Sequence, residues 1–464
     1  MNEPQGVCVY MTIRSLNPAT EEVLETYDAY SLEQTNAILD DVATAWESWR
    51  TTSFSYRAAC LKRAAQKLRS QASELAVIMA REMGKPIRQG EGEVGKCAAV
   101  LDFYAEEAEG MLAPERVEGV GRKACVTFEP MGTVLTVMPW NFPLWQVFRI
   151  AAPSLMAGNT MVLKHASNVP QCALAIERIF KEAELPENIF RTLLIGARQV
   201  ESVLDHPSVF AVSLTGSEPA GRKVASAAGA RLKKSVMELG GSDPFILLPD
   251  ADMDEAVRVA TLSRCGNTGQ TCIAAKRFIV FEEVYETFVS RLSESMSKLV
   301  IGDPLESATD MGPMSSGTLR EELQEQVDRC VESGGVLRLG GALPKGPGFY
   351  YPPTIITDLP PDASVAREEL FGPVALVFKV SSVDEALALA NDTPFGLGGS
   401  VWTGDEEKGV EIAGRIRTGC VFVNGLVRSD VHLPFGGTGS SGYGRELGVW
   451  GIREFVNIKP VCIG

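Results

Sequence analysis

Histidine is scarce in this chain: only His165, His206 and His432 occur among 464 residues. This scarcity disfavours catalysis by a serine, a histidine and an aspartate, and it disfavours metal centres with several histidine ligands. The ten cysteines include no Cys-x-x-Cys pair and no spacing typical of a zinc site. No secretion signal is evident either, so the sequence favours a reduced, cytoplasmic protein without a metal.

Basic residues are also fewer than acidic residues. The chain has 44 lysines and arginines against 59 acidic residues, which gives a formal net charge of −15. Such a balance argues against nucleic acid and against anionic membranes as partners. It allows an anionic small molecule, because a local basic residue can override the global field.

Long uninterrupted apolar runs are absent, so no membrane-spanning helix is predicted. The longest apolar stretch, residues 131–163, predicts buried strands and a helix of a folded domain. The residues that interrupt it are Pro139, Asn141, Pro143, Arg149, Pro153 and Asn159. Residues 1–10 precede a second methionine, Met11, and are interpreted as a loose extension or a start-site ambiguity.

The composition is that of a soluble globular protein, with 45% hydrophobic and 22% charged residues. The chain is longer than one hydrophobic core supports, so two or three domains are expected. Apolar residues at three-to-four spacing predict helices over 32–49, 55–82 and 87–108. A hairpin is expected over 115–129.

From residue 131 onward, short β-branched runs alternate with helical patterns, which predicts βαβ units and parallel sheets. The pattern restarts after Gly241, so Gly240-Gly241 is taken as a domain boundary. Strands are expected at 132–138, 160–163, 189–194, 209–214, 245–248, 277–281, 354–357, 374–380, 400–403 and 419–423.

Three of these strands end in residues suited to chemistry: Asn141, Lys164 and the Thr215-Gly-Ser217 segment follow them. Ligands bind beyond the carboxyl ends of strands in open parallel sheets. The turn from Gly216 to Gly221 opens a helix and suits a phosphate group. An ordinary strand-to-helix turn is the alternative.

Cys272 closes the loop Gly-Asn-Thr-Gly-Gln-Thr-Cys, where backbone amides and few apolar neighbours would favour a reactive thiolate. The alternative is an inert buried thiol, which is the expectation for the other nine cysteines. Met237–Gly241 is placed at the end of a lysine-rich helical stretch, from which Glu238 could return to the thiol as a base.

Several short motifs follow one another along the chain. They are Pro139-Trp-Asn-Phe-Pro143, Val162-Leu-Lys164, Leu214-Thr-Gly-Ser217, Met237-Glu-Leu-Gly-Gly241, Gly269-Gln-Thr-Cys272, Glu369-Leu-Phe-Gly-Pro373, Asn424 and Pro434-Phe-Gly-Gly437. Together, in this order and spacing, they resemble the aldehyde dehydrogenase superfamily from Met11 to Gly464.

The resemblance implies a mechanism. Cys272 would attack the aldehyde carbon, Asn141 would hold the oxyanion with the Cys272 backbone N–H, and Glu238 would activate the water that releases a free acid. For isolated residues, a strand end for Asn141 and a helix-end salt bridge for Glu238 are the alternatives.

The resemblance also implies a nicotinamide dinucleotide cofactor, with Lys164 and Glu369 at its two riboses. Ser167 stands where many NAD-preferring relatives carry a glutamate that would repel a 2′-phosphate, so NADP is expected to be preferred over NAD. The residues expected to bind the cofactor are Met138, Pro139, Trp140, Lys164, Ser167, Thr215, Gly216, Ser217, Gly221, Leu239, Glu369 and Phe371.

Arg149 lies on an otherwise apolar helix and would hold a substrate carboxylate, with an internal salt bridge as the alternative. With Ser429, five residues before Pro434, it makes the chain resemble the succinic semialdehyde dehydrogenases. The resemblance is closest to the short bacterial and cyanobacterial members, through the segment Leu163-Lys-His-Ala-Ser-Asn-Val-Pro170. Glutarate semialdehyde, a cysteine-dependent esterase or acyltransferase activity, and a binding protein without activity are the competing hypotheses.

The resemblance implies two doubly wound α/β domains, a Rossmann-like cofactor domain and a catalytic domain, plus a small β oligomerisation element. The cofactor domain is assigned to 11–109 and 131–240, and the catalytic domain to 241–440. Segments 110–130 and 441–464 would join subunits into a homodimer or homotetramer, with packing on their own subunit as the alternative.

Overall fold

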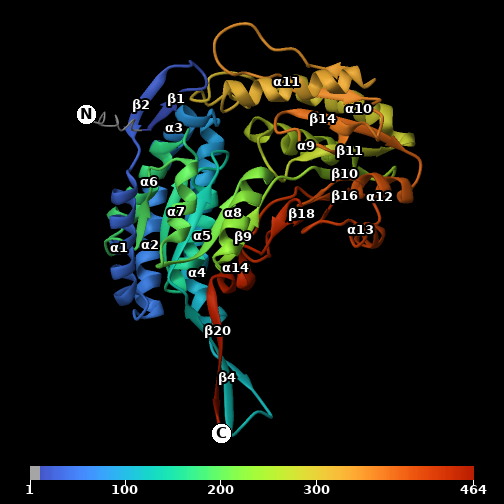
Figure 1. Ribbon diagram of the computed structural model, residues 1–464. Helices are drawn as coiled ribbons and strands as arrows, with labels where there is room; N and C mark the ends of the chain where they lie inside the picture. Colours follow the sequence, from blue (N-terminus) through green and yellow to red (C-terminus); the bar gives the residue numbers. More distant parts are fainter. Residues whose placement is uncertain (1–10) are drawn as a thin grey trace, which may run out of the picture.

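A computed structural model describes residues 11–464, and the interpretation of residues 1–10 lies outside this range. Two large sheets, each packed against helices, make up most of the molecule, and a narrow three-stranded arm extends from it (Figure 1). The predicted α/β fold, with two largely parallel sheets and a small β element, is confirmed.

The first sheet has the strand order β19-β9-β8-β5-β6-β7, and every pairing except β19 with β9 is parallel. The chain runs outward from β5 through β6 and β7 and then returns to the other side of β5 as β8. This reversal creates a crevice between the carboxyl ends of β5 and β8, where open α/β sheets bind ligands. The strands are β5 (Thr133–Met138), β6 (Thr160–His165), β7 (Phe190–Thr192), β8 (Val209–Thr215), β9 (Lys234–Glu238) and β19 (Gly442–Tyr443).

Both faces of this sheet are buried, because successive side chains of a strand point to opposite faces. In β5, Val134 joins a cluster with α2, α4, α5 and α6, whereas Leu135 joins a cluster with α1, α7 and α8. The helices are α1 (Leu32–Trp49), α2 (Phe54–Ser70), α3 (Ala72–Met83), α4 (Ile87–Met111), α5 (Trp145–Met156), α6 (Pro170–Glu182), α7 (Val200–Asp205), α8 (Glu218–Ala230) and α14 (Gly448–Glu454).

Two predictions for this half are wrong. The single helix expected over 55–82 is broken at Gln71, whose backbone leaves the helical region while the apolar periodicity continues. The lysine-rich stretch before Met237 is not helical at its end: α8 stops at Ala230, Leu232 takes a left-handed φ of 52°, and β9 follows. Pairing with β8, a non-local contact, determines that strand.

The second sheet has the order β12-β13-β14-β11-β10-β16-β17 and is parallel apart from the pairing of β12 with β13. Its strands are β10 (Asp243–Leu247), β11 (Ala275–Phe281), β12 (Val336–Leu339), β13 (Thr354–Thr357), β14 (Val374–Val380), β16 (Ser400–Trp402) and β17 (Phe422–Val423). Its helices are α9 (Met253–Cys265), α10 (Glu282–Ser297), α11 (Gly317–Glu332), α12 (Val383–Asn391) and α13 (Glu406–Ala413).

The arm consists of β3 (Glu115–Val117), β4 (Lys123–Pro130) and β20 (Val456–Ile463), in the antiparallel order β20-β4-β3. The predicted hairpin and the C-terminal strand therefore pair with each other within one chain. Beyond Val456, every residue of β20 is exposed. Figure 1 shows the arm extending away from both sheets.

Shorter elements complete the fold. A hairpin of β1 (Thr12–Leu16) and β2 (Val23–Asp28) lies at the start of the described chain, and β15 (Phe395–Gly396) pairs with β18 (Thr438–Gly439). Within residues 11–464, no helix has the length and apolar character needed to cross a bilayer. The same residues contain no cluster of three or more side chains suited to holding a metal ion.

Candidate active site

A cavity of about 210 Å³ lies where the carboxyl ends of β5 and β8 meet the loop that carries Cys272. It brings together residues from both halves of the chain, most of which the sequence analysis had singled out. The lining residues are Pro139, Trp140, Asn141, Gln146, Thr215, Gly216, Ser217, Leu239, Gly240, Cys272, Leu319, Glu369 and Phe371.

The loop before Cys272 has an unusual backbone. Asn267, Thr268 and Gly269 follow one another with φ values of 54°, 56° and 70°, a left-handed conformation that costs energy for residues with a Cβ. Side-chain hydrogen bonds hold this shape: Asn267 Nδ2 donates to the carbonyl of Asn141 at 2.8 Å, and Thr268 Oγ1 donates to the carbonyl of Gly312 at 3.0 Å. The bond to Asn141 ties the Cys272 loop to the segment after β5.

Asn141 is buried, and its side-chain amide is fixed at both ends. Its Nδ2 donates to the carbonyl of Gln270 at 2.9 Å, and its Oδ1 accepts from Gln146 Nε2 at 3.1 Å. These bonds orient the Asn141 N–H group beside the cysteine loop, where an oxyanion donor is needed. Gln146, which the sequence analysis did not single out, sets this orientation.

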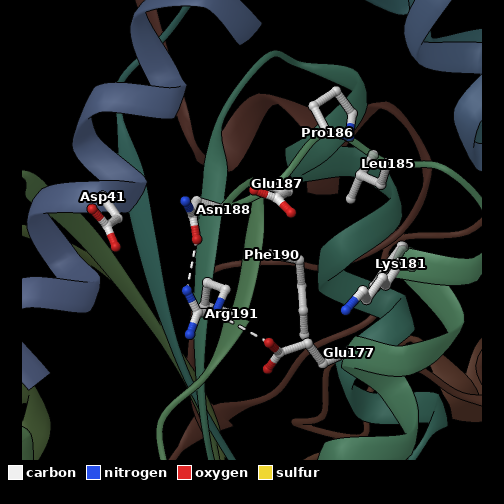
Figure 2. Close-up of a pocket in the computed structure, with 10 residues that line it drawn as sticks. Asp41, Glu177, Lys181, Leu185, Pro186, Glu187, Asn188, Phe190 and Arg191 are labelled. Carbon is white, nitrogen blue, oxygen red and sulfur yellow. Dashed lines mark hydrogen bonds and ion pairs between the residues drawn. The ribbon is translucent and has the colours of Figure 1, made fainter. Parts of the chain in front are cut away.

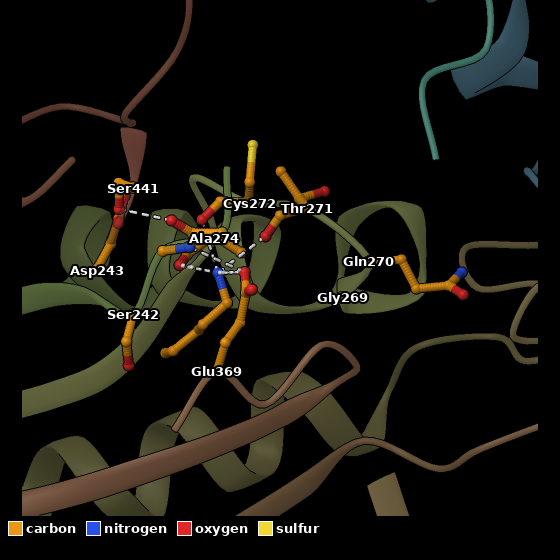
Figure 3. Close-up of polar contacts among 12 residues, drawn as sticks. Ser242, Asp243, Gly269, Gln270, Thr271, Cys272, Ala274, Glu369 and Ser441 are labelled. Carbon is orange, nitrogen blue, oxygen red and sulfur yellow. Dashed lines mark hydrogen bonds and ion pairs between the residues drawn. The ribbon is translucent and has the colours of Figure 1, made fainter. Parts of the chain in front are cut away.

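The surroundings of Cys272 disfavour the thiolate form of its side chain. It packs against the large apolar cluster of the first half, so the expectation of few apolar neighbours is wrong. Burial raises the pKa of the Cys272 thiol to about 12, while the positive charges of Lys276 and Arg149 act in the opposite direction. Figure 3 shows its sulfur pointing away from the polar network beneath the loop.

Lys276 organises that network. Its ammonium donates to the carbonyls of Thr271 at 3.0 Å and Cys272 at 2.7 Å, and it lies 3.4 Å from Glu369 Oε1. The same oxygen of Glu369 accepts from the Gly241 backbone at 3.0 Å. Lys276 therefore links the cysteine loop to Glu369. In the sequence, only its position four residues after Cys272 indicated that Lys276 could belong to the site.

Glu238 ends β9 and is buried, with neither carboxyl oxygen hydrogen-bonded to any residue from 11 to 464. Burial raises the pKa of the Glu238 carboxyl well above its usual value, and the nearby Glu446 carboxyl raises it further. Both effects favour the neutral carboxyl over the carboxylate. It does not line the cavity itself, although its neighbours Leu239 and Gly240 do.

Arg149 forms a buried ion pair with Glu446, donates from Nη2 to Thr215 Oγ1 at 3.3 Å and stacks over the ring of Phe435. The internal salt bridge, which the sequence left as the alternative, is therefore present. Contact of Arg149 with a substrate carboxylate stays a prediction. Nothing in the sequence around Glu446 identified it as the partner.

Ser429, the second residue expected to bind substrate, accepts a hydrogen bond from Lys96 Nζ at 2.7 Å. The same ammonium lies 4.1 Å from the centroid of the Trp145 ring. Lys96 was missed because it is one lysine on a long, mixed helix, and its partners lie 49 and 333 residues away in the sequence. The structure thus adds a cation to the predicted pair of Arg149 and Ser429.

The residues expected at the cofactor lie around β5, β6 and β8. Trp140 and Phe371 meet edge to face with centroids 5.9 Å apart. Ser217 precedes α8 without capping it, so the backbone N–H groups of Glu218 and Ala220, on either side of Pro219, are available to a ligand. A Cβ on Gly221 would lie 2.5 Å from the Leu239 side chain, so glycine allows α8 to approach the cavity wall.

Met138 is buried at the end of β5. Lys164 is buried near the end of β6, and burial lowers the pKa of its ammonium. Ser167 is exposed in the loop that follows. Neither Lys164 nor Ser167 lines the cavity at Cys272. Lys164 lies in β6 and Ser167 just beyond it, and β6 neighbours β5 on the side away from β8.

A larger cavity, of about 420 Å³, lies elsewhere (Figure 2). Among its lining residues, Arg191 donates to Glu177 at 3.1 Å and to Asn188 at 2.6 Å. Its arginine is therefore already paired, and it contains none of the predicted site residues. The smaller cavity at Cys272 is the candidate active site.

The α/β fold, with a cysteine in a cavity at the switch point of a parallel sheet, is the arrangement expected of a cysteine-dependent enzyme that binds a nucleotide. The family model of the aldehyde dehydrogenase family matches residues 9–461, and the chain belongs to this family. The predicted resemblance is confirmed.

Individual relatives match over their full length. The chain is 50% identical over 453 residues to a "probable succinate-semialdehyde dehydrogenase [NADP(+)]" from Synechocystis sp., covering 98% of this chain and 100% of the relative. It is 46% identical over 456 residues to a succinate-semialdehyde dehydrogenase [NADP(+)] from Mycobacterium leprae, with the same coverages. The solved structure of succinic semialdehyde dehydrogenase from Streptococcus pyogenes with NADP⁺ matches with a TM-score of 0.95 and 37% identity, covering 97% of this chain and 99% of that one.

Proposed function

We propose that the protein oxidises succinic semialdehyde, or a similar short anionic aldehyde, to the free acid with NADP⁺ as the preferred cofactor. The observation that carries the proposal is the meeting of Cys272, Asn141 and Glu369 in one cavity at the switch point of the first sheet. The relatives named for this reaction, which match at 46–50% identity over their full length, support the choice of substrate and cofactor.

The reaction begins at the sulfur. The Cys272 thiol gives its proton to water, the thiolate sulfur bonds to the aldehyde carbon, and the carbonyl oxygen becomes an oxyanion. The Asn141 amide and the Cys272 backbone N–H stabilise this oxyanion, while the positive charge of Lys276 stabilises the thiolate that precedes it. Loss of two electrons and a proton from the thiohemiacetal leaves a thioester on Cys272.

Glu238 acts in the second half of the reaction. After losing its proton, its carboxylate takes a proton from water, the water oxygen bonds to the thioester carbon, and the bond to sulfur breaks. The products are the acid and the free thiol. Burial without hydrogen bonds makes Glu238 a stronger base than an exposed carboxylate.

The chain offers a place for a dinucleotide. The free amides at the start of α8 suit its pyrophosphate, Glu369 at the cavity suits the ribose next to the nicotinamide, and Lys164 suits the ribose next to the adenine. Bound NADP⁺ would supply the acceptor for the two electrons that leave the substrate. Ser167 offers a hydroxyl and no negative charge near Lys164, which favours a 2′-phosphate.

The test is an assay of NADPH formation from succinic semialdehyde, with the Cys272→Ala variant as control. The proposal expects NADPH with wild-type protein, none with the variant, and a lower kcat/KM with NAD⁺. Absence of cofactor reduction with every short aldehyde, or cleavage of esters alone, would contradict it. We further propose a homo-oligomer that works in the reducing cytoplasm, which suits the free cysteines of the described chain.

A further inference from the structure

Lys276 is a buried lysine whose ammonium is surrounded by backbone carbonyl groups. Its side chain is 1% exposed, and Nζ lies 3.0 Å from the Thr271 oxygen, 2.7 Å from the Cys272 oxygen and 3.4 Å from the Ala274 oxygen. Removal of an ammonium from water is costly unless its N–H groups find acceptors. Burial of Lys276 therefore requires that these carbonyl groups face it.

A second buried cation holds the two ends of the same loop. Arg264, on α9, is fully buried. Its guanidinium donates to the Gly269 carbonyl at 2.6 Å and to the Ala275 carbonyl at 3.2 Å. Two cations thus bind carbonyl groups before and after Cys272, and they restrict rotation of the peptide units between Gly269 and Ala275.

The contact between Lys276 and Thr271 determines the direction of one N–H group. The Thr271 carbonyl and the Cys272 N–H belong to the same planar trans peptide, in which the two groups point in opposite directions. Since the carbonyl points at Lys276, the Cys272 N–H points away from it. Figure 3 shows the Cys272 sulfur also pointing away from the polar contacts that include Glu369. The sulfur and the N–H are therefore both directed away from Lys276.

This N–H is available to a ligand. It donates to no backbone or side-chain acceptor among residues 11–464. Cys272 and Asn141 line the same cavity, whereas Lys276 does not. Asn141 Nδ2 carries two N–H groups, and the Gln270 carbonyl accepts from one of them. One backbone donor and one side-chain donor thus remain for an oxyanion at Cys272.

The peptide between Thr271 and Cys272 could in principle take the opposite orientation. Its carbonyl oxygen would then point where the N–H points now, and it would repel an oxyanion. With Lys276 in place, this rotation would leave a buried N–H donor of the ammonium without an acceptor, which is costly. The charge of Lys276 also polarises the peptide through the carbonyl, which makes the Cys272 N–H a stronger donor.

We propose that Lys276 is a positioning residue for the oxyanion: through the Thr271 carbonyl it orients and polarises the Cys272 N–H. This inference rests on the proposed function, because the oxyanion forms when the thiolate adds to the aldehyde. The role is distinct from stabilisation of the thiolate, which requires only the charge of Lys276.

Two reactions of Cys272 separate these roles. Alkylation by iodoacetamide requires the thiolate and forms no oxyanion, whereas addition to an aldehyde requires both. Both rates are measured at one pH and at saturating NADP⁺, the second as the rate of the NADPH burst at saturating succinic semialdehyde. A change in thiolate stability alone lowers the two rates by the same factor.

Lys276→Met removes the charge and the N–H donors but keeps an unbranched side chain. Its burst rate should fall by about 10²–10³-fold more than its alkylation rate, the usual effect of losing one oxyanion donor. Lys276→Gln, which keeps N–H donors on a shorter side chain, should show a smaller extra loss. If Lys276→Met does not fold, as judged by its thermal unfolding, Lys276→Gln and the wild type still provide the comparison.

Two further variants calibrate the measurement. Asn141→Ala removes the other oxyanion donor, so its burst rate should also fall by more than its alkylation rate. Lys62→Met should match the wild type in both reactions, because Lys62 is half-exposed on α2 and pairs with Glu106 at the surface.

Failure of the proposed function and failure of this inference give different results. If the wild type forms no NADPH with any short aldehyde, the proposed function is wrong and the role of Lys276 falls with it. If the wild type shows the burst and the Lys276 variants lower both rates by the same factor, Lys276 acts on the thiolate alone and does not position the N–H.

Discussion

Arg149 and Glu446 form an ion pair in which the side chains are 4% and 0% exposed, respectively. The two residues come from α5 and from the segment just before α14, almost 300 positions apart in the sequence. Phe435 covers the guanidinium on one side. Because both charges are buried, each depends on the other for compensation, and the pair holds the C-terminal segment against the first sheet.

Removal of one partner should therefore be costly. We expect Arg149→Met and Glu446→Gln each to lower the free energy of unfolding by roughly 3–5 kcal/mol, because each leaves a buried charge without its partner. Urea unfolding monitored by tryptophan fluorescence measures this loss. The double variant Arg149→Met/Glu446→Gln should be more stable than either single variant, since no charge remains. Additive losses in the double variant would show that the two residues act independently.

Glu238→Gln should separate the two halves of the reaction. The variant should still form the thioester, so stopped-flow absorbance should show a burst of up to one NADPH per active site. Steady-state turnover should then fall by roughly 10²–10⁴-fold, the usual contribution of a general base. A steady-state rate equal to that of the wild type would exclude Glu238 as the base.

The pH dependence of thioester hydrolysis should also report on Glu238. Burial and the Glu446 carboxyl both raise the pKa of Glu238, and only the deprotonated form can act as a base. The single-turnover hydrolysis rate should therefore rise as the pH increases through this pKa. Glu446→Gln removes one of the two causes, so the midpoint should move to lower pH. A move to higher pH would contradict this origin of the shift.

The sequence predicted the sheets well, because their strands are short β-branched runs between helical periods. It failed where a non-local contact decides the structure. β9 forms because it pairs with β8. Lys233 and Lys234, at the start of this segment, made it look like a continuation of the helix that precedes it. The break at Gln71 was invisible for a related reason, since the apolar spacing runs through it.

For the site, residues within short motifs were predicted, whereas their partners were not. Asn141 and Cys272 were named in advance, but Gln146, Lys276 and Lys96 were missed. These residues act on the site through hydrogen bonds or charge that only the folded chain brings into place. The burial that raises the pKa of the thiol was not foreseen, because the composition of the loop does not reveal the apolar cluster against which it packs.

Ser167 provides a test of cofactor choice. In Ser167→Glu, a carboxylate would repel the 2′-phosphate and accept hydrogen bonds from a ribose that lacks it. The ratio of kcat/KM for NADP⁺ to that for NAD⁺ should fall by at least about tenfold, which corresponds to ~1.4 kcal/mol. Ser167→Ala is the control, since it removes a hydroxyl without adding charge and should change the ratio less. An unchanged ratio in Ser167→Glu would refute the assignment.

Substitutions in the arm can test the proposed assembly of subunits into a homo-oligomer. β20 is the edge strand of a three-stranded sheet and exposes Ile458 and Val461 at 56% and 44%, a liability that a second subunit would remove. Ile458→Asp/Val461→Asp should lower the molar mass measured by light scattering and leave the fold intact. Val410→Asp, at an exposed position on α13, should not. A monomeric wild type, or a double variant of unchanged mass, would exclude assembly through β20.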